Sequence, residues 1–190
     1  MRSISPRLQL TLLIVGALLL LGLFPRWLDR LRAREGEVRP PEAGLLLVAR
    51  PGSGDQNFAK TVVLLVAVGP ERTWGLVLNC VRTPQDEALP AGVDRWGGPV
   101  SPEHRTTLIR SREATPGARR VLEGLSWREG AAPERLPAGT SLTFAGLSVW
   151  GPGQLEHELS RGGWVLVEGD AEQVFSHPGA LWAERIAPHL

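Results

Sequence analysis

The residues best suited to chemistry lie in a glycine-rich turn that leads into a predicted helix, Trp150-Gly-Pro-Gly-Gln. Pro152 suits a first helical position, because the N–H that proline lacks would have no helical acceptor there. A helix that begins at this point leaves the backbone N–H groups of residues 153–155 unpaired at its positive end, where they could hold an anion. In the alternative interpretation, Glu156 in the first helical turn satisfies that end itself.

Two glutamates of the same predicted helix do not form an acid/base pair. Glu156 and Glu158 are two residues apart, so a helix rotates their side chains by about 200° onto nearly opposite faces. Glu158 is also three residues from Arg161, a spacing typical of an ion pair on a helix surface. Leu155 and Leu159 lie four apart and form the apolar face of this helix.

Other turns and strand ends offer weaker candidates. The turn Gly97-Gly98-Pro99 could bring the backbone close to a ligand, since glycine tolerates positive φ, or it could be a tight structural turn. Asn79 follows a predicted strand, where its amide could meet either a turn or a ligand. Asn57 is expected to bond local backbone beside Asp55, which caps a short turn, although a ligand is the alternative.

Patterns for metal, nucleophile and cofactor chemistry do not occur in the sequence. The four histidines and the single cysteine are scattered and give no metal-ligand spacing: His104, His157, His177, His189 and Cys80. The segment Gly52-Ser-Gly does not match the GxSxG nucleophile elbow, and there is no P-loop or dinucleotide fingerprint. We therefore expect no catalytic residue, no metal and no cofactor, and we interpret Cys80 as a small buried hydrophobe.

The elements that position these residues follow from short hydrophobic runs. Residues 45–49 and 61–68 are nearly continuous apolar runs with branched side chains, typical of buried central strands. Turn chemistry at residues 69–72 predicts a hairpin to a third strand at residues 74–79. Further strands are expected at residues 106–109, 141–144 and 164–167, loops at residues 82–96 and 133–139, and helices at residues 152–162 and 180–189.

Strands and helices occur in mixed order without regular βαβ alternation, so the fold class is α+β. A chain of 190 residues with one cysteine supports a single domain held by its hydrophobic core, without a disulfide scaffold. We expect one compact domain, residues 45–190, with a mostly antiparallel mixed sheet flanked by short helices and preceded by one transmembrane helix.

The predicted transmembrane helix is the uncharged run from Leu8 to Pro25. About 18 residues at about 1.5 Å each give roughly 27 Å, just enough to cross a bilayer core. A cleaved signal peptide is the alternative, but residues 26–31 offer no small-residue cleavage site, so an uncleaved anchor is predicted. Residues 1–34 form this anchor and its basic flank, and residues 35–44 form a linker. The arginines after the run outnumber the positive charges before it, which favours the inner membrane with the body on its cytoplasmic side.

The charge distribution argues against nucleic acid as a partner. The net charge of +1 combines a basic first 40 residues, with seven Arg and three acidic residues, and a mildly acidic remainder. Nucleic-acid binding usually needs a concentrated basic face, and the acidic remainder gives no obvious one.

Four segments together resemble the YqgE/AlgH family, also called UPF0301. They are Arg-Pro-Gly-Ser-Gly-Asp-Gln-Asn-Phe-Ala-Lys-Thr-Val-Val-Leu-Leu at residues 50–65, Gly-Leu-Val-Leu-Asn at residues 75–79, Gly-Gly-Pro-Val at residues 97–100 and Trp-Gly-Pro-Gly-Gln-Leu-Glu-His-Glu-Leu at residues 150–159. Later matches are Trp164, Asp170, Phe175 and Trp182. The sequence departs from the family pattern at Cys80-Val81, where Arg-Pro is usual, at Leu147, where Tyr is usual, and at Val149, where Gly is usual.

The resemblance implies a compact bacterial α+β protein with no settled enzymatic activity, and the predicted span implies a tethered version of it. Our leading hypothesis is a noncatalytic regulatory or scaffold module that binds a protein partner or a small anion. One alternative is a hydrolase with a polar pocket around Asn79, Gln154 and Glu156, and another is the transcriptional regulator suggested by the family label. The residues expected to bind a ligand or partner are Asn57, Asn79, Gly97, Gly98, Pro99, Trp150, Gly151, Gly153, Gln154 and Glu156.

Overall fold

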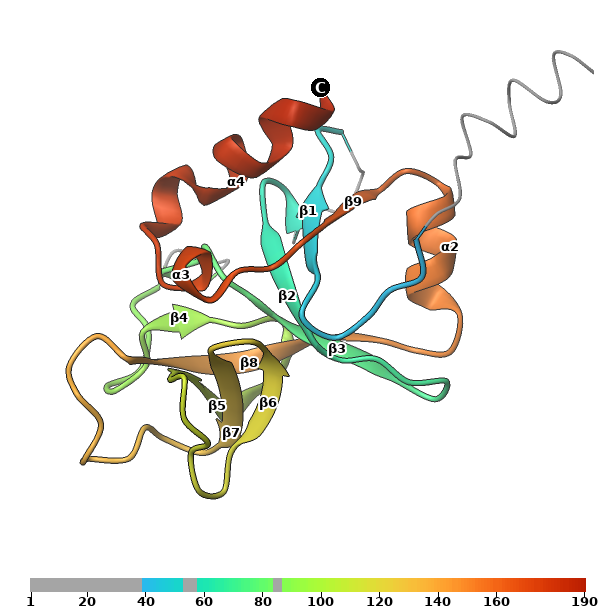
Figure 1. Ribbon diagram of the computed structural model, residues 1–190. Coiled ribbons are helices and arrows are strands. Elements are labelled where there is room, and N and C mark those ends of the chain that lie inside the picture. The colour runs from blue at the N-terminus through green and yellow to red at the C-terminus, as the bar shows by residue number, and fades with distance from the viewer. Residues whose placement is uncertain (1–38, 53–57, 84–86) are drawn as a thin grey trace, which may run out of the picture. The chain divides into compact units, whose positions relative to one another are not determined.

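The computed structural model describes residues 39–52, 58–83 and 87–190 (Figure 1). The predicted membrane span and residues 35–38 of the predicted linker lie outside the described residues, and so does Asn57. In the part of the chain that is described, no helix has both the length and the apolar character needed to cross a membrane.

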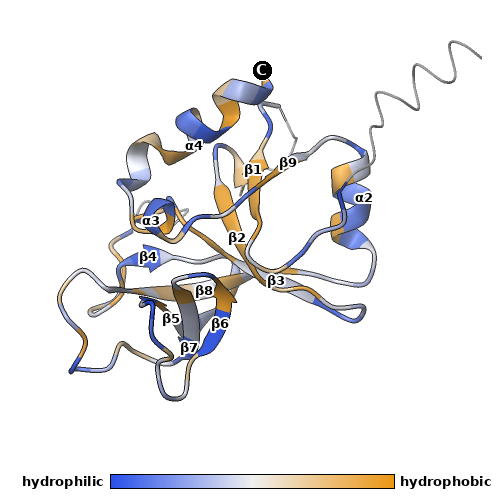
Figure 2. Cartoon of the chain, in the orientation of Figure 1, coloured by the Kyte–Doolittle hydropathy of each residue, from blue (hydrophilic) through white to orange (hydrophobic). Residues whose placement is uncertain are grey.

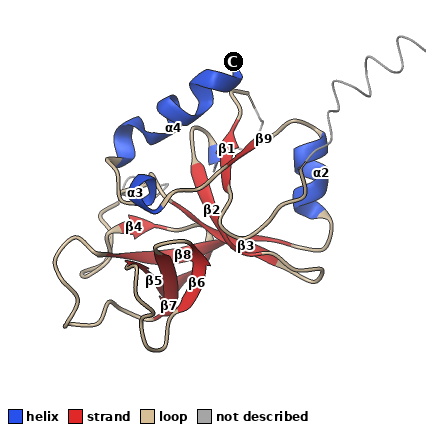
Figure 3. Ribbon diagram, viewed as in Figure 1, coloured by secondary structure: helices blue, strands red, loops and turns tan. Residues whose placement is uncertain are grey.

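The described residues form one nine-stranded sheet. Its strands are β1 (Leu46–Ala49), β2 (Val62–Ala67), β3 (Thr73–Val77), β4 (Arg95–Trp96), β5 (Val100–Arg110), β6 (Arg119–Leu122), β7 (Leu125–Glu129), β8 (Ser141–Trp150) and β9 (Trp164–Val167). The helices are α2 (Gln154–Ser160), α3 (Ala171–Val174), α4 (Pro178–Ile186) and the 3₁₀ turn η2 (Ala187–His189). Figure 3 shows α3 and α4 on one side of β1 and β2, and α2 on the other side.

The strand order is β6-β7-β5-β8-β3-β2-β1-β9, and every pair along this path is antiparallel. β4 lies off the path and pairs with β8 in parallel. The expected α+β class with a mostly antiparallel sheet and short helices is therefore confirmed for the described residues.

The face of β1, β2 and β3 that helices α3 and α4 cover forms the larger of two hydrophobic cores. Leu46, Leu64 and Leu76 are fully buried on this face and pack with Phe144 of β8. Helices α3 and α4 close this core, with Leu181 of α4 among its buried residues. In Figure 2 the ribbons of β1 and β2 are hydrophobic along almost their whole length.

The opposite face of the same strands forms a second core beneath helix α2. Leu47 and Val63 point to this face, since neighbouring residues of a strand alternate between its two sides. Leu155 and Leu159 pack on them from α2, as their spacing predicts. Burial on both faces explains why β1 and β2 read as continuous apolar runs rather than as alternating ones.

The sheet curls until segments beside its two ends meet. A side chain at Gly169, which follows β9, would lie 2.1 Å from the carbonyl oxygen of Gly44 and 3.1 Å from Leu122 of β6. Gly44, just before β1, has φ +93°, which also favours glycine. The close approach of these three residues brings the end of β6 against the β1–β9 pair.

Several predicted elements have different bounds in the structure. Residues 82–96 are not all loop, because Arg95 and Trp96 form β4 against β8. The strands expected at residues 106–109 and 141–144 are parts of the longer β5 and β8. Strands β6 and β7 and helix α3 were not expected at all.

Candidate functional site

The glycine turn before α2 is closed by its own hydrogen bonds. Gly153 adopts a left-handed conformation with φ 69°, and helix α2 begins at Gln154 rather than at Pro152. The N–H of Gln154 donates to Gly151 O at 3.1 Å, while the Gln154 side-chain Oε1 accepts from the Gly151 N–H at 3.1 Å. The prediction that the Gln154 N–H is unpaired is therefore wrong, because the turn itself provides an acceptor.

Glu158 is the centre of the hydrogen bonds around α2. Its Oε2 accepts from the indole Nε1 of Trp150 at 3.0 Å and of Trp164 at 2.8 Å. Its Oε1 accepts from Gln154 Nε2 at 2.9 Å. The predicted ion pair with Arg161 does not form within 4.0 Å, since the carboxylate faces the two indoles instead.

The Trp150 and Trp164 rings form a buried aromatic cluster with Phe58. Trp150 is 2% exposed and Trp164 is 7% exposed. The Phe58 ring centroid lies 6.2 Å from that of Trp150 and 5.5 Å from that of Trp164. The segment that begins at Trp150 thus fastens α2 to the sheet. The Glu156 side chain is exposed and makes no hydrogen bond within the described residues.

Gly97 and Gly98 are buried by the backbone of β8. A side chain at Gly98 would lie 2.2 Å from the carbonyl carbon of Leu147. The carbonyl oxygen of Gly97 accepts from Val77 N at 2.9 Å and from Ser148 Oγ at 3.1 Å. The structure therefore favours the structural interpretation of this turn, in which glycine permits close packing. Pro99, the third residue of this turn, is exposed.

Asn79 extends the pairing of β2 and β3 with its side chain. Its Oδ1 accepts from the Val62 N–H at 2.9 Å, and its Nδ2 donates to Lys60 O at 2.8 Å. Both polar atoms of the amide are therefore used by backbone. No hydrogen bond joins any two of Asn79, Gln154 and Glu156, so the polar pocket required by the hydrolase alternative is not formed by these side chains.

Arg95 is a buried cation that sequence reasoning did not identify. It is 6% exposed and donates to Leu78 O and, at 3.1 Å, to Ser176 O. Burial lowers the pKa of Arg95, and the nearby Asp94 carboxylate opposes that shift. Arg95 thereby links the end of β3 to the connection between α3 and α4. Its neighbours in sequence do not distinguish it from the exposed arginines.

A larger cavity of about 700 Å³ lies between the end of β5, the β6–β7 turn and the start of α3. Arg110 in its wall is held by three contacts: it donates to Glu172 Oε2 at 2.5 Å and to Gly139 O at 3.2 Å, and its guanidinium lies 4.8 Å from the Phe175 ring centroid. Arg112 and Glu123 also line the cavity, and neither has a partner among the described residues.

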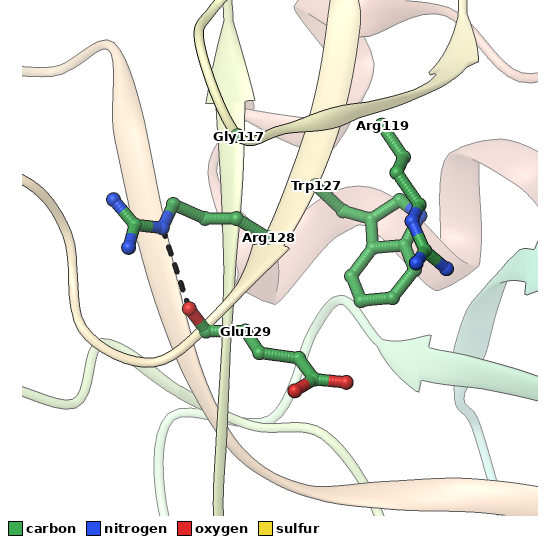
Figure 4. A pocket seen from close by; sticks show the side chains of 5 residues that line it. All are labelled: Gly117, Arg119, Trp127, Arg128 and Glu129. Carbon is green, nitrogen blue, oxygen red and sulfur yellow. Dashed lines mark hydrogen bonds between the residues drawn. The ribbon is translucent and has the colours of Figure 1, made fainter.

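A smaller cavity of about 240 Å³ lies beside strands β6 and β7 (Figure 4). It is lined by Gly117, Arg119, Trp127, Arg128 and Glu129. Sequence reasoning missed both cavities because it did not predict these strands. Among the described residues, no three His, Cys, Asp or Glu side chains come together as ligands for a metal.

A protein-family model described as AlgH-like matches residues 46–188, which include the whole described sheet and helices α2, α3 and α4. This match covers most of the chain. The protein belongs to the AlgH-like family. The resemblance seen in the four sequence segments is thereby confirmed.

Relatives of this AlgH-like chain occur in several bacteria. A UPF0301 protein of Streptomyces coelicolor is 38% identical over 160 residues, which cover 74% of this chain and 83% of that protein. A UPF0301 protein of Cupriavidus pinatubonensis is 33% identical over 160 residues, with 70% and 79% covered. These names give the family and not an activity.

Two solved structures share the AlgH-like fold. The solution structure of the AlgH protein from Pseudomonas aeruginosa matches with a TM-score of 0.57 and 27% identity, over 77% of this chain and 87% of that one. The crystal structure of protein DIP2367 from Corynebacterium diphtheriae matches with a TM-score of 0.65 and 22% identity, over 79% and 88%. The second similarity concerns the fold alone.

The departures from the AlgH-like pattern fall on packed or exposed positions, not in the two cavities. Leu147 and Val149 pack partly buried against the larger core. Cys80 packs against the core beneath α2, and burial raises the pKa of its thiol. Val81 is 53% exposed.

Proposed function

We propose that this AlgH-like protein is a noncatalytic binding module that recognises a protein partner through its larger cavity. The observation that carries the proposal is the pair of charged side chains, Arg112 and Glu123, that line this cavity without a partner in the described residues. They lie beside the fixed Arg110–Glu172 ion pair. Two unpaired side chains of opposite charge that line the larger cavity fit a partner surface of complementary charge.

The hydrogen bonds of the glycine turns support the same proposal. The polar atoms of Gln154 and Asn79 are consumed by neighbours within the domain, so they provide no convergent set for acid/base chemistry. We therefore keep neither the hydrolase alternative nor a ligand role for Gly97 and Gly98. No observation favours direct DNA contact by the body, and we expect no nucleic-acid partner.

A photo-crosslinking amino acid at position 123 of the full chain tests partner recognition. We expect a crosslinked product of defined mass in cells, and we expect Arg112→Glu to abolish it, because this change reverses one of the two charges. Arg72→Glu is the matched control, since Arg72 is exposed and lies before β3, outside the cavity lining. Equal loss in both variants, or no product specific to position 123, would contradict the proposal.

We further propose that residues 8–25 hold this module at the inner membrane with the body in the cytoplasm. The support is the uncharged run in the sequence and the excess of arginines that follows it. The full chain should remain in the membrane pellet after alkaline carbonate extraction, whereas a chain without residues 1–38 should be released. A reporter fused after Leu190 should be active only if it is a cytoplasmic one. Release of the full chain, or activity of a periplasmic reporter, would count against this placement.

A further inference from the structure

The hairpin of β6 and β7 carries two unpaired charges of opposite sign on one face. The register places Arg119 opposite Trp127, and Glu129 follows Trp127 by two residues on β7. Directly opposite residues share a face and neighbouring residues of a strand alternate, so these three side chains lie on one face and Arg128 points to the other. Figure 4 shows Trp127 and Glu129 on one side of β7 and Arg128 on the opposite side.

The Arg119 guanidinium is held by packing and not by hydrogen bonds. Its carbon lies 5.5 Å from the centroid of the Trp127 ring. That ring meets the ring of Trp74 edge to face, with centroids 4.9 Å apart, and Trp74 belongs to the larger core. Within the described residues, Arg119 makes no hydrogen bond or ion pair, so its N–H groups stay available. A donor that is already positioned loses less conformational entropy when it binds a ligand.

The Glu129 carboxylate is the negative group on the same face. It is exposed and has no hydrogen bond or ion pair in the part of the chain that the structure describes. Arg119 and Glu129 are diagonal neighbours across the two strands, a relationship that places Cα atoms about 7–8 Å apart. They form no ion pair with each other, since the guanidinium lies over the indole. A space therefore remains between two opposite charges.

This space is the smaller cavity, with a volume of about 240 Å³. Gly117, two residues before Arg119, also lines it, and a side chain at Gly117 would meet no atom within 4 Å. The absence of a side chain at this position helps to keep the cavity open. Pockets for drug-sized ligands have volumes of about 300–1,000 Å³, so a ligand of this cavity is small.

Protection of the sheet edge does not require this arrangement. β6 is an edge strand, and charged side chains on an edge hinder pairing with another sheet. Arg120 provides such a charge, because it is exposed and lies on the same strand. The contact of Arg119 with an indole, beside an unpaired carboxylate, adds nothing to that protection.

We propose that this cavity binds a free α-amino acid as a zwitterion. The α-carboxylate accepts two hydrogen bonds from Arg119, because its two oxygens match the planar guanidinium fork. The α-ammonium group donates to the Glu129 carboxylate. An amino acid joins its two charges through one carbon atom, so it can bridge two side chains that do not meet each other. A ligand with a single charge would leave one of the two side chains unpaired.

Isothermal titration of the full chain in uncharged detergent micelles tests this site with three related compounds. L-Alanine carries both charges, L-alaninamide carries only the ammonium group, and N-acetyl-L-alanine carries only the carboxylate. We expect L-alanine to bind about tenfold or more tightly than either analogue, since each analogue lacks one charge-assisted contact. Equal binding of the three compounds, or no binding of L-alanine, would overturn the proposal.

Two substitutions assign the contacts one at a time. Arg119→Ala should weaken L-alanine binding by about tenfold or more. It should leave the affinity for L-alaninamide unchanged, because this analogue has no carboxylate, and that unchanged affinity also shows that the variant is folded. Glu129→Gln should weaken L-alanine binding and leave N-acetyl-L-alanine unaffected. Arg119→Lys should retain only part of the affinity, because an ammonium group lacks the planar fork.

Two control variants separate the site from general surface charge. Arg120→Ala and Arg128→Ala each remove one positive charge from the same hairpin, but from the face opposite to Arg119. Both should leave the affinity for L-alanine unchanged within about twofold. If either control weakens binding as much as Arg119→Ala does, binding reflects net charge and the proposal is wrong. The partner role of the larger cavity is independent of this result.

Discussion

Glu158 Oε2 accepts the indole N–H of Trp164 at 2.8 Å, and this bond fastens helix α2 to strand β9. The same oxygen accepts the indole N–H of Trp150 at the end of β8. One carboxylate therefore joins the two strands between which α2 lies in the chain. In the sequence this glutamate looked like a surface residue, whereas in the fold it is a structural acceptor.

Glu158→Gln should destabilise the protein by about 1–3 kcal/mol, because an amide group then faces donors that need an acceptor. Urea unfolding followed by tryptophan fluorescence measures this change, with the full chain in detergent micelles. Glu156→Gln is the matched control on the same helix and should change the free energy of unfolding by less than about 0.5 kcal/mol. Equal effects would show that the indole bonds carry no special weight.

Gly98→Ala should destabilise the protein by about 3 kcal/mol or more, because the new side chain would overlap the backbone of Leu147. Gly92→Ala serves as its control, since Gly92 also has positive φ but no atom within 4 Å of the added carbon. The control should cost only about 1–2 kcal/mol for the left-handed conformation. Thermal unfolding of both variants checks the difference. A Gly98 variant as stable as the Gly92 variant would contradict the close packing of β4 and β8.

Arg95→Lys should loosen the two C-terminal helices. A lysine ammonium lacks the fork that donates to both Leu78 O and Ser176 O, and a buried carbonyl left without a donor costs about 1–3 kcal/mol. Hydrogen exchange of backbone amides in α3 and α4 should therefore be faster in this variant. Arg161→Lys is the control and should leave these exchange rates unchanged, because Arg161 is exposed. Unchanged protection in Arg95→Lys would show that this buried cation does not hold the helices.

Cys80 should react slowly with alkylating reagents. Burial raises the pKa of its thiol, so a smaller fraction is thiolate at a given pH than in the unfolded chain. The midpoint of alkylation rate against pH should lie above that of the urea-unfolded chain, as followed by mass spectrometry.

The raised pKa of the Cys80 thiol also makes the stability of the protein depend on pH. The folded state binds the thiol proton more tightly, so the free energy of unfolding should fall as pH rises from the ordinary thiol pKa through the raised one. Cys80→Ala should remove this part of the pH dependence. A midpoint equal to that of the unfolded chain would refute both expectations.

The central strands could be predicted from the sequence because their physical environment is simple. Residues 46–49 and 62–67 are buried on both faces, and a continuous apolar run records that directly. Strand β9 was predicted at its observed bounds, residues 164–167, between the glycines that flank it. The two leucines of α2 gave its buried face correctly.

The hairpin of β6 and β7 could not be predicted in the same way. β6 reads Arg-Arg-Val-Leu and β7 reads Leu-Ser-Trp-Arg-Glu, so polar side chains interrupt both short strands. β6 pairs with β7, and β7 in turn pairs with β5, an earlier strand that β6 separates from it in the sequence. Because both cavities are lined partly by this hairpin or its turn, the candidate binding residues on it were missed as well.

Local spacing also explains the error at Glu158. The spacing of residues along a helix reveals partners on that helix only, and Arg161 is such a residue. The true partners, Trp150 and Trp164, come from the strands before and after α2. A bond of this kind becomes visible only when the order of the strands in the sheet is known.

Strand β1 is paired on one side with β2, which follows it closely, and on the other with β9, near the end of the chain. During synthesis on the ribosome, β1 therefore keeps one edge open until residues 164–167 have left the exit tunnel. An open apolar edge of this kind invites association between nascent chains. A stop codon before residue 164 should thus yield a product that chaperones retain or proteases remove, rather than a smaller folded domain.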